Sequence, residues 1–163
     1  MKRIITLTLA ALLLVGTLTA CGGKDDGPAD NETVDLTAFY DSLAEEYGWE
    51  GNYMTDLTDD MLESYYPGLQ DLTLEQRVSK MPMMTSVVNE LAFLECADED
   101  TAASAAALLQ DRIDTQAEGG AWYPESMEAW GRGIVIQQGA YVGMIASAEH
   151  QDEIVEKFNA LFA

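Results

Sequence analysis

The chain has 163 residues, which is enough for one domain of ordinary size with a single core. Its 29 acidic and 8 basic residues give a formal net charge of −21. Such an acidic surface repels nucleic acid and anionic lipid headgroups, so we expect neither to bind through charge.

The N-terminal segment has the pattern of a secretory signal peptide. Lys2 and Arg3 provide a basic start, and residues 4–16 form an apolar run. A membrane-spanning helix needs about 20 apolar residues, so this run is too short to span and suits a signal peptide.

The end of this segment resembles the bacterial lipobox, in which a leucine, a small residue, and an alanine or glycine precede a cysteine. The matching residues are Leu18, Thr19, Ala20 and Cys21. We therefore predict that the signal peptidase recognises the first three and that the Cys21 sulfur carries a diacylglycerol. Two acyl chains anchor a protein stably. The predicted location is the outer face of the cytoplasmic membrane, with the lipid on Cys21 as the membrane contact.

Cleavage would remove residues 1–20 and leave 143 residues. Because two basic residues and no acidic ones would be lost, the net charge would become −23. Residues 21–33 are polar, contain Gly and Pro and lack apolar periodicity, so they are predicted to be a flexible spacer. The folded domain is predicted over residues 34–163. With Cys21 acylated, Cys96 has no partner, and no disulfide is expected.

Two helices are predicted at the start of the domain. The first covers residues 35–47, with Asp35 as its N-cap and Gly48 as its C-cap. The second covers residues 58–66 and has acidic residues in its first turn. Residues 72–84 are compatible with an edge strand, because their proline cannot donate to a neighbouring strand.

The middle of the chain predicts a strand over residues 86–97 and a helix from about residue 98 to 116. The strand is apolar on both faces in its second half, which favours an interior position. The helix has a buried stripe formed by Ala102, Ala105, Ala106, Leu109 and Ile113. A short helix is predicted over residues 124–130, after the Gly119-Gly120 break.

The C-terminal part predicts a β-hairpin and a closing helix. Two apolar runs within residues 133–147 flank a predicted Gln138-Gly139 turn. Residues 148–162 are amphipathic and would close the core. The predicted fold class is α+β: a small, mainly antiparallel sheet of three to four strands packed by helices on one face, in a single domain that follows the cleaved signal peptide.

The residues with chemical potential do not form a recognisable catalytic motif. His150 is the sole histidine, so a zinc site built from several histidines is excluded within one chain. Cys96 is expected to be a small buried residue. Carboxylate pairs occur at many spacings, as any chain this acidic would show. We predict no catalytic, cofactor-binding or metal-binding residue.

Several aromatic residues fall at predicted helix ends and loops. Trp122, Tyr123, Trp130 and Tyr53 form the candidate ligand surface. Aromatic rings beside carboxylates can bind a cation, a sugar or a peptide. The alternative is that these rings close the ends of the core.

Four features together resemble a known family. They are the lipobox followed by Gly22-Gly23, the 57–66 segment, the Met81-Pro82-Met83-Met84 run before a valine-rich strand, and the Gly139-Ala140-Tyr141-Val142 hairpin before the closing helix. This pattern is similar to the small Firmicutes lipoproteins with domain of unknown function 4358. The resemblance implies a Gram-positive envelope and an extracytoplasmic domain, and it supplies no activity or site residues.

These observations favour a non-enzymatic binding or accessory module at the cell surface, whose protein or cell-wall partner the sequence does not identify. The alternative is a small extracytoplasmic enzyme that uses carboxylates. A cleft with two facing acids, at least one of them buried, would support that alternative.

Overall fold

The computed structural model describes residues 33–49, 53–84 and 86–163. The segment Thr33–Ala163 is one compact unit, in which the described residues form five α-helices and an open five-stranded antiparallel sheet. The single domain of mixed helix and sheet that the sequence predicts is therefore confirmed. The predicted signal peptide and the anchor residue Cys21 lie outside the described residues.

The sheet has the strand order β1-β2-β3-β5-β4. Its strands are β1 (Met54–Asp56), β2 (Leu74–Pro82), β3 (Asn89–Cys96), β4 (Ile134–Gln138) and β5 (Tyr141–Ser147). The expectation of three to four strands was wrong, because the sheet also contains the short strand β1. This strand pairs Met54 with Pro82, so β2 is not the edge strand that the sequence suggested. Three residues are too few to show a period of two, which explains why β1 was missed.

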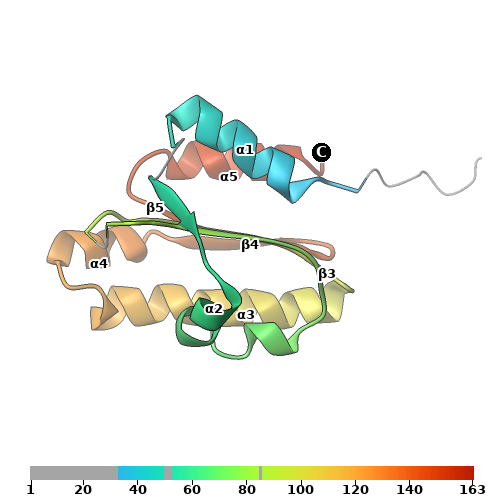
Figure 1. Cartoon of the computed structure of the whole chain (residues 1–163), viewed down its shortest axis with the longest axis horizontal. Helices are drawn as coiled ribbons and strands as arrows, with labels where there is room; N and C mark the ends of the chain where they lie inside the picture. Colours follow the sequence, from blue (N-terminus) through green and yellow to red (C-terminus); the bar gives the residue numbers. More distant parts are fainter. Residues whose placement is uncertain (1–32, 50–52, 85) are drawn as a thin grey trace, which may run out of the picture. The chain divides into compact units, whose positions relative to one another are not determined.

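Helices cover both faces of the sheet, as Figure 1 shows. On one face lie α1 (Leu36–Tyr47) and α5 (Gln151–Ala160); on the other lie α2 (Asp59–Tyr65), α3 (Glu99–Thr115) and α4 (Pro124–Trp130). The expectation of helices on one face was therefore wrong. The physical reason is in β3, where Phe93 packs into one buried cluster and Leu94 into the other, so both faces need cover. Within the described ranges, no helix is long and apolar enough to cross a bilayer.

The face covered by α1 and α5 is packed with aromatic rings, and we call it the aromatic face. Phe93 and Phe158 stack with their centroids 5.6 Å apart, and Phe39 meets Phe93 edge-on at 5.0 Å. Gly143 pairs with Phe93 across β3 and β5, and a Cβ there would lie 3.0 Å from the Phe158 ring. This strand position therefore needs a glycine so that the rings can stack.

The opposite face is packed by α3 through small residues, and we call it the alanine face. Ala102 and Ala105 are fully buried, and Leu109 and Ile113 continue the stripe that the sequence predicts. Small side chains allow the helix backbone to approach the sheet closely. Cys96 is buried on this face, as expected.

Local signals at the helix ends and the hairpin agree closely with the structure. The Asp35 carboxylate caps α1 by accepting from the Ala38 amide at 2.9 Å, and Gly48 ends the helix with φ 71°. The hairpin turn is Gly139-Ala140, because Gln138 pairs with Tyr141. The predicted Gln138-Gly139 turn was thus one residue early; Gly139, with φ 59°, is the first turn residue and not the second.

Candidate functional site

Two adjoining hollows lie at the end of the sheet where β3 begins. The first, which we call the Arg112 pocket, has a volume of about 260 Å³. Its walls include Tyr65, Glu90, Arg112, Gln116, Trp122 and Trp130. These residues come from α2, β3, α3 and the segment through α4, so the pocket depends on the alanine face being assembled.

A buried ion pair forms one wall of the Arg112 pocket. The Arg112 Nε and Nη2 atoms donate to the two Glu90 oxygens at 3.0 and 2.8 Å, and Tyr66 Oη donates to Glu90 Oε1 at 2.8 Å. The Glu90 side chain is 4% exposed and that of Arg112 is 14% exposed. A planar two-point pair of this kind fixes the guanidinium in one orientation.

Two aromatic rings make cation–π contacts with the guanidinium of Arg112. The Arg112 Cζ lies 4.6 Å from the Tyr65 ring centroid and 5.2 Å from that of Trp130. Burial opposes the charge, but the hydrogen bonds and the charge of Glu90 outweigh it and raise the pKa of Arg112. Burial, followed by the Glu90 charge, raises the pKa of Tyr66 well above its ordinary value. Arg112 therefore stays charged at neutral pH, and Tyr66 keeps its proton.

A π-type turn, η2 (Gln116–Gly120), ends α3 and places the aromatic residues around the pocket. Gly119 has φ 127°, a conformation that side chains rarely adopt, and a Cβ at Gly120 would lie 2.5 Å from Gln116 Nε2. The chain then extends outward through Trp122 before α4 returns Trp130 to the pocket wall. The Gly119-Gly120 pair, which predicts only a helix break from sequence, thus shapes the pocket.

The second hollow, which we call the carboxylate pocket, has a volume of about 490 Å³ and shares Val87 and Asn89 with the first. Its charged residues are Glu125, Glu128, Arg132 and Glu149, and its aromatic residues are Trp49 and Tyr53. Arg132 pairs with Glu128 at 3.4 Å, so carboxylates remain in excess. The Oδ1 atom of Asn89 is buried and has no hydrogen-bond partner among the described residues.

The structure places the four predicted ligand-surface residues differently. Trp122 is 93% exposed and lines the Arg112 pocket together with Trp130, which is only 6% exposed. Tyr53 is 39% exposed and lines the carboxylate pocket. Tyr123 is exposed at the start of α4 and lines neither pocket. Trp130 therefore acts as a pocket wall and as part of the core at once.

Sequence reasoning missed Glu90 and Arg112. A signal was present, because Glu90 lies between the apolar residues Val88 and Ala92 on one face of the predicted strand. A buried carboxylate needs a cation or hydrogen-bond donors. Arg112 follows the buried Leu109 by three positions on α3, which places it beside the helix stripe. The pairing of Glu90 with Arg112 was missed because the two residues are 22 positions apart in the sequence.

The other candidate groups are not assembled into a site. Within the described part of the chain, no group of three or more His, Cys, Asp or Glu residues could hold a metal ion. Cys96 lies beside the Gly139-Ala140 turn, whereas His150 follows the far end of β5, so the two do not meet. Burial raises the pKa of the Cys96 thiol. His150 is the N-cap of α5 and stacks on Tyr47, with the ring centroids 4.3 Å apart.

The described residues thus form a small α+β domain, in which an antiparallel sheet lies between two helical layers and an aromatic-walled pocket opens at one end. The chain belongs to the family described as domain of unknown function (DUF4358), whose model matches residues 47–147. The resemblance seen in the sequence is thereby confirmed at the level of the family. Comparisons with curated proteins and with solved structures found no match.

The matched residues include the whole sheet, α2, α3, α4 and the complete Arg112 pocket. The helices of the aromatic face lie outside the match, apart from Tyr47 at the end of α1. The Arg112 pocket is therefore built entirely from the family domain.

Proposed function

We propose that the protein is a non-enzymatic binding or accessory module, held on the outer face of the cytoplasmic membrane by lipid on Cys21. The lipobox sequence before Cys21 supports the anchor. The observation that carries the binding role is Trp122, which is 93% exposed beside the Arg112 pocket. A tryptophan that contributes so little to the core is typical of a residue that gains its contacts from a partner.

The position of the first described residues supports an orientation in which the candidate site faces away from the membrane. The Val34 amide donates to Tyr141 Oη at 3.3 Å, and the Val34 carbonyl accepts from Gln76 Nε2 at 2.8 Å. Tyr141 and Gln76 both donate to Glu95, near the end of β3. We call this network the Val34 clamp, and it holds the start of the domain at the Glu95 end of the sheet.

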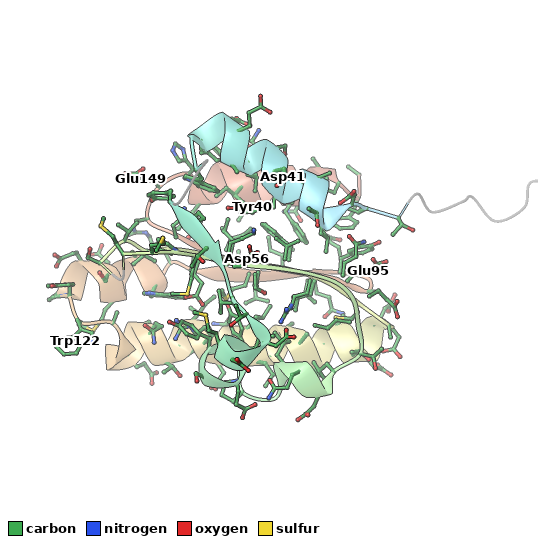
Figure 2. The ribbon with its side chains drawn as sticks, in the orientation of Figure 1. Tyr40, Asp41, Asp56, Glu95, Trp122 and Glu149 are labelled. Carbon is green, nitrogen blue, oxygen red and sulfur yellow. The ribbon has the colours of Figure 1, made fainter. Side chains whose placement is uncertain are left out.

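The candidate site lies at the other end of the sheet, and Figure 2 shows Glu95 and Trp122 toward opposite ends of the domain. The strand between the Val34 clamp and the site covers about 20 Å from Asn89 to Glu95 at ~3.3 Å per residue. A tether joined before Thr33 would therefore leave the Trp122 end facing away from the membrane. This geometry suits a module that presents its binding surface to the cell exterior.

The alternative of a carboxylate-dependent enzyme gains no support from the pocket geometry. Among the described residues, Glu90 is the one buried carboxylate, and Arg112 and Tyr66 occupy its oxygens. The remaining acids of the hollows, Glu125, Glu128 and Glu149, are exposed. The arrangement favours binding over acid–base chemistry.

Site-specific photo-crosslinking on intact cells tests the binding role. A photoreactive amino acid replaces Trp122 in one variant and the exposed Glu75, at the Val34 end of the sheet, in a matched control. We expect a discrete crosslinked product from position 122 and none from position 75. Equal products from both positions, or none from position 122, would contradict a binding surface at this end.

Substituting Cys21→Ser tests the anchor separately. The expected outcome is release of the protein or accumulation of the uncleaved precursor, measured by membrane fractionation and by the mass of the product. A variant that stays on the membrane at the mature mass would show that Cys21 is not the anchor.

A further inference from the structure

The surface around the Arg112 pocket has the composition of a protein interface. Met83 and Met84 are 65% and 63% exposed and follow Pro82 of the pocket wall, and Trp122 and Tyr123 are 93% and 52% exposed. Methionine, aromatic residues and arginine are enriched where proteins bind one another, and flexible methionines adapt to varied side chains. This composition alone does not identify the occupant of the surface. The charges of the two pockets narrow the choice.

The two hollows differ in charge, although they adjoin. The charged residues that line the Arg112 pocket are Arg112 and Glu90, and they neutralise each other. The carboxylate pocket keeps an excess of negative charge from Glu125, Glu128 and Glu149. An occupant that lies across both therefore needs an apolar group on one side and a positive charge on the other.

One fixed polar group of the Arg112 pocket is left for such an occupant. Arg112 uses Nε and Nη2 for Glu90, and its Nη1 has no hydrogen-bond partner among the described residues. A backbone carbonyl of an extended peptide is the complement of this donor.

From these contacts we infer that the Trp122 end binds a peptide segment of a partner protein, with an apolar or aromatic side chain in the Arg112 pocket and a basic residue at the carboxylate pocket. A second copy of this chain does not fit, because it would bring carboxylates against carboxylates on a chain of charge −21. This inference rests on the proposed function and gives its ligand a chemical class.

Trp122 provides the readout. The chain has 3 tryptophans, and Trp49 and Trp130 are 8% and 6% exposed, so acrylamide should quench mainly Trp122. The full-length chain in detergent is titrated with three acetylated, amidated peptides: Lys-Phe-Leu-Lys, Glu-Phe-Leu-Glu and Lys-Ser-Ser-Lys. Tri-N-acetylglucosamine serves as the saccharide probe. The Trp122→Phe variant, which keeps a ring but loses the signal, shows that the change comes from this residue.

We expect Lys-Phe-Leu-Lys to shield Trp122 and to bind about tenfold more tightly than either other peptide, because each lacks one of the two required features. Replacing Glu125, Glu128 and Glu149 by glutamine alters exposed positions only, and should weaken the Lys-Phe-Leu-Lys complex by up to about tenfold and reduce its salt dependence. Arg112→Lys, which keeps the charge but loses the planar fork, should weaken it as well.

Equal binding of the three peptides, or shielding by the saccharide alone, would overturn the inference. So would unchanged peptide affinity in the triple glutamine variant. If no peptide binds while crosslinking from position 122 still yields its product, the peptide class is wrong and the proposed function stands. If both experiments fail, both proposals fall.

Discussion

The two faces of the sheet are stabilised by different means. The aromatic face holds a stack of phenylalanine rings and buries no charged group among the described residues. The alanine face holds small side chains under α3 and buries the Glu90–Arg112 pair at the rim of an open pocket. The first face is packed by apolar rings and keeps its ion pairs near the surface, whereas the second combines packing with a buried ion pair.

The two faces also differ in how far the family match covers them. The family match contains the alanine face and stops before the helices of the aromatic face. Without those helices, solvent would reach three fully buried residues of the sheet, Leu91, Phe93 and Ile145. The matched segment is therefore shorter than the unit that buries its own core.

The largest expected effect comes from breaking the charge pair of the alanine face. Glu90→Ala leaves the guanidinium of Arg112 uncompensated and should lower the free energy of unfolding by about 3–5 kcal/mol. Urea denaturation measures the loss. The double variant Glu90→Leu/Arg112→Met should recover most of it, because a well-packed apolar pair is often as stable as a buried ion pair. A loss below about 1 kcal/mol for Glu90→Ala would mean that water, and not Glu90, satisfies Arg112.

A smaller effect is expected from crowding the aromatic face. Gly143→Ala places a Cβ 3.0 Å from the Phe158 ring, which Phe39, Phe93 and Phe162 hold in place. Overpacking of this kind costs about 1–3 kcal/mol in the free energy of unfolding. Combining it with Phe158→Leu should give less than the sum of the two single losses, since the clash is removed. An additive result would place the strain elsewhere.

The third prediction separates binding from stability within the alanine face. Trp122→Ala should change the free energy of unfolding by no more than about 0.5 kcal/mol, because the ring is exposed. Trp130→Ala removes a buried ring and should cost about 3–5 kcal/mol. Thermal unfolding compares the two. A large loss for Trp122→Ala would show that this ring supports the fold and would weaken its assignment as a binding residue.

The smallest effect depends on pH. Hydrogen bonding by the Thr101 side chain, and then by its backbone amide, lowers the pKa of the α3 cap Asp98 below its usual 3.8. A carboxyl whose pKa is lower when folded contributes stability above its unfolded pKa and loses it as pH falls through the folded value. The stability difference between the native chain and Asp98→Asn should therefore shrink as pH falls from about 6 to about 3. A pH-independent difference would exclude this linkage.

Local signals made much of the fold predictable. Asp35 and Gly48 define both ends of α1, and Asp98 caps α3, because caps act within a few residues of the helix end. The interior position of β3 followed from its two apolar faces. The period of two along this strand places Leu91 and Phe93 on one side and Leu94 on the other, which agrees with the two clusters.

The remainder depended on contacts between distant parts of the sequence. Strand β1 forms only through its pairing with β2. The second helical layer is needed because both faces of β3 are apolar and must be covered. Trp122 is exposed, but the sequence reasoning that selected it as a ligand-surface residue grouped it with Trp130, which α4 places in the core. Residue type alone cannot distinguish two tryptophans whose surroundings are set by a π-type turn.

The Val34 clamp has a mechanical consequence. Tension applied along the chain before Thr33 would reach the domain at Val34, whose backbone is held by the side chains of Gln76 and Tyr141. These side chains belong to β2 and β5, and both donate to Glu95 of β3, the strand between them. A pull is thus shared by three adjacent strands, and the load enters at the end of the sheet farthest from Trp122.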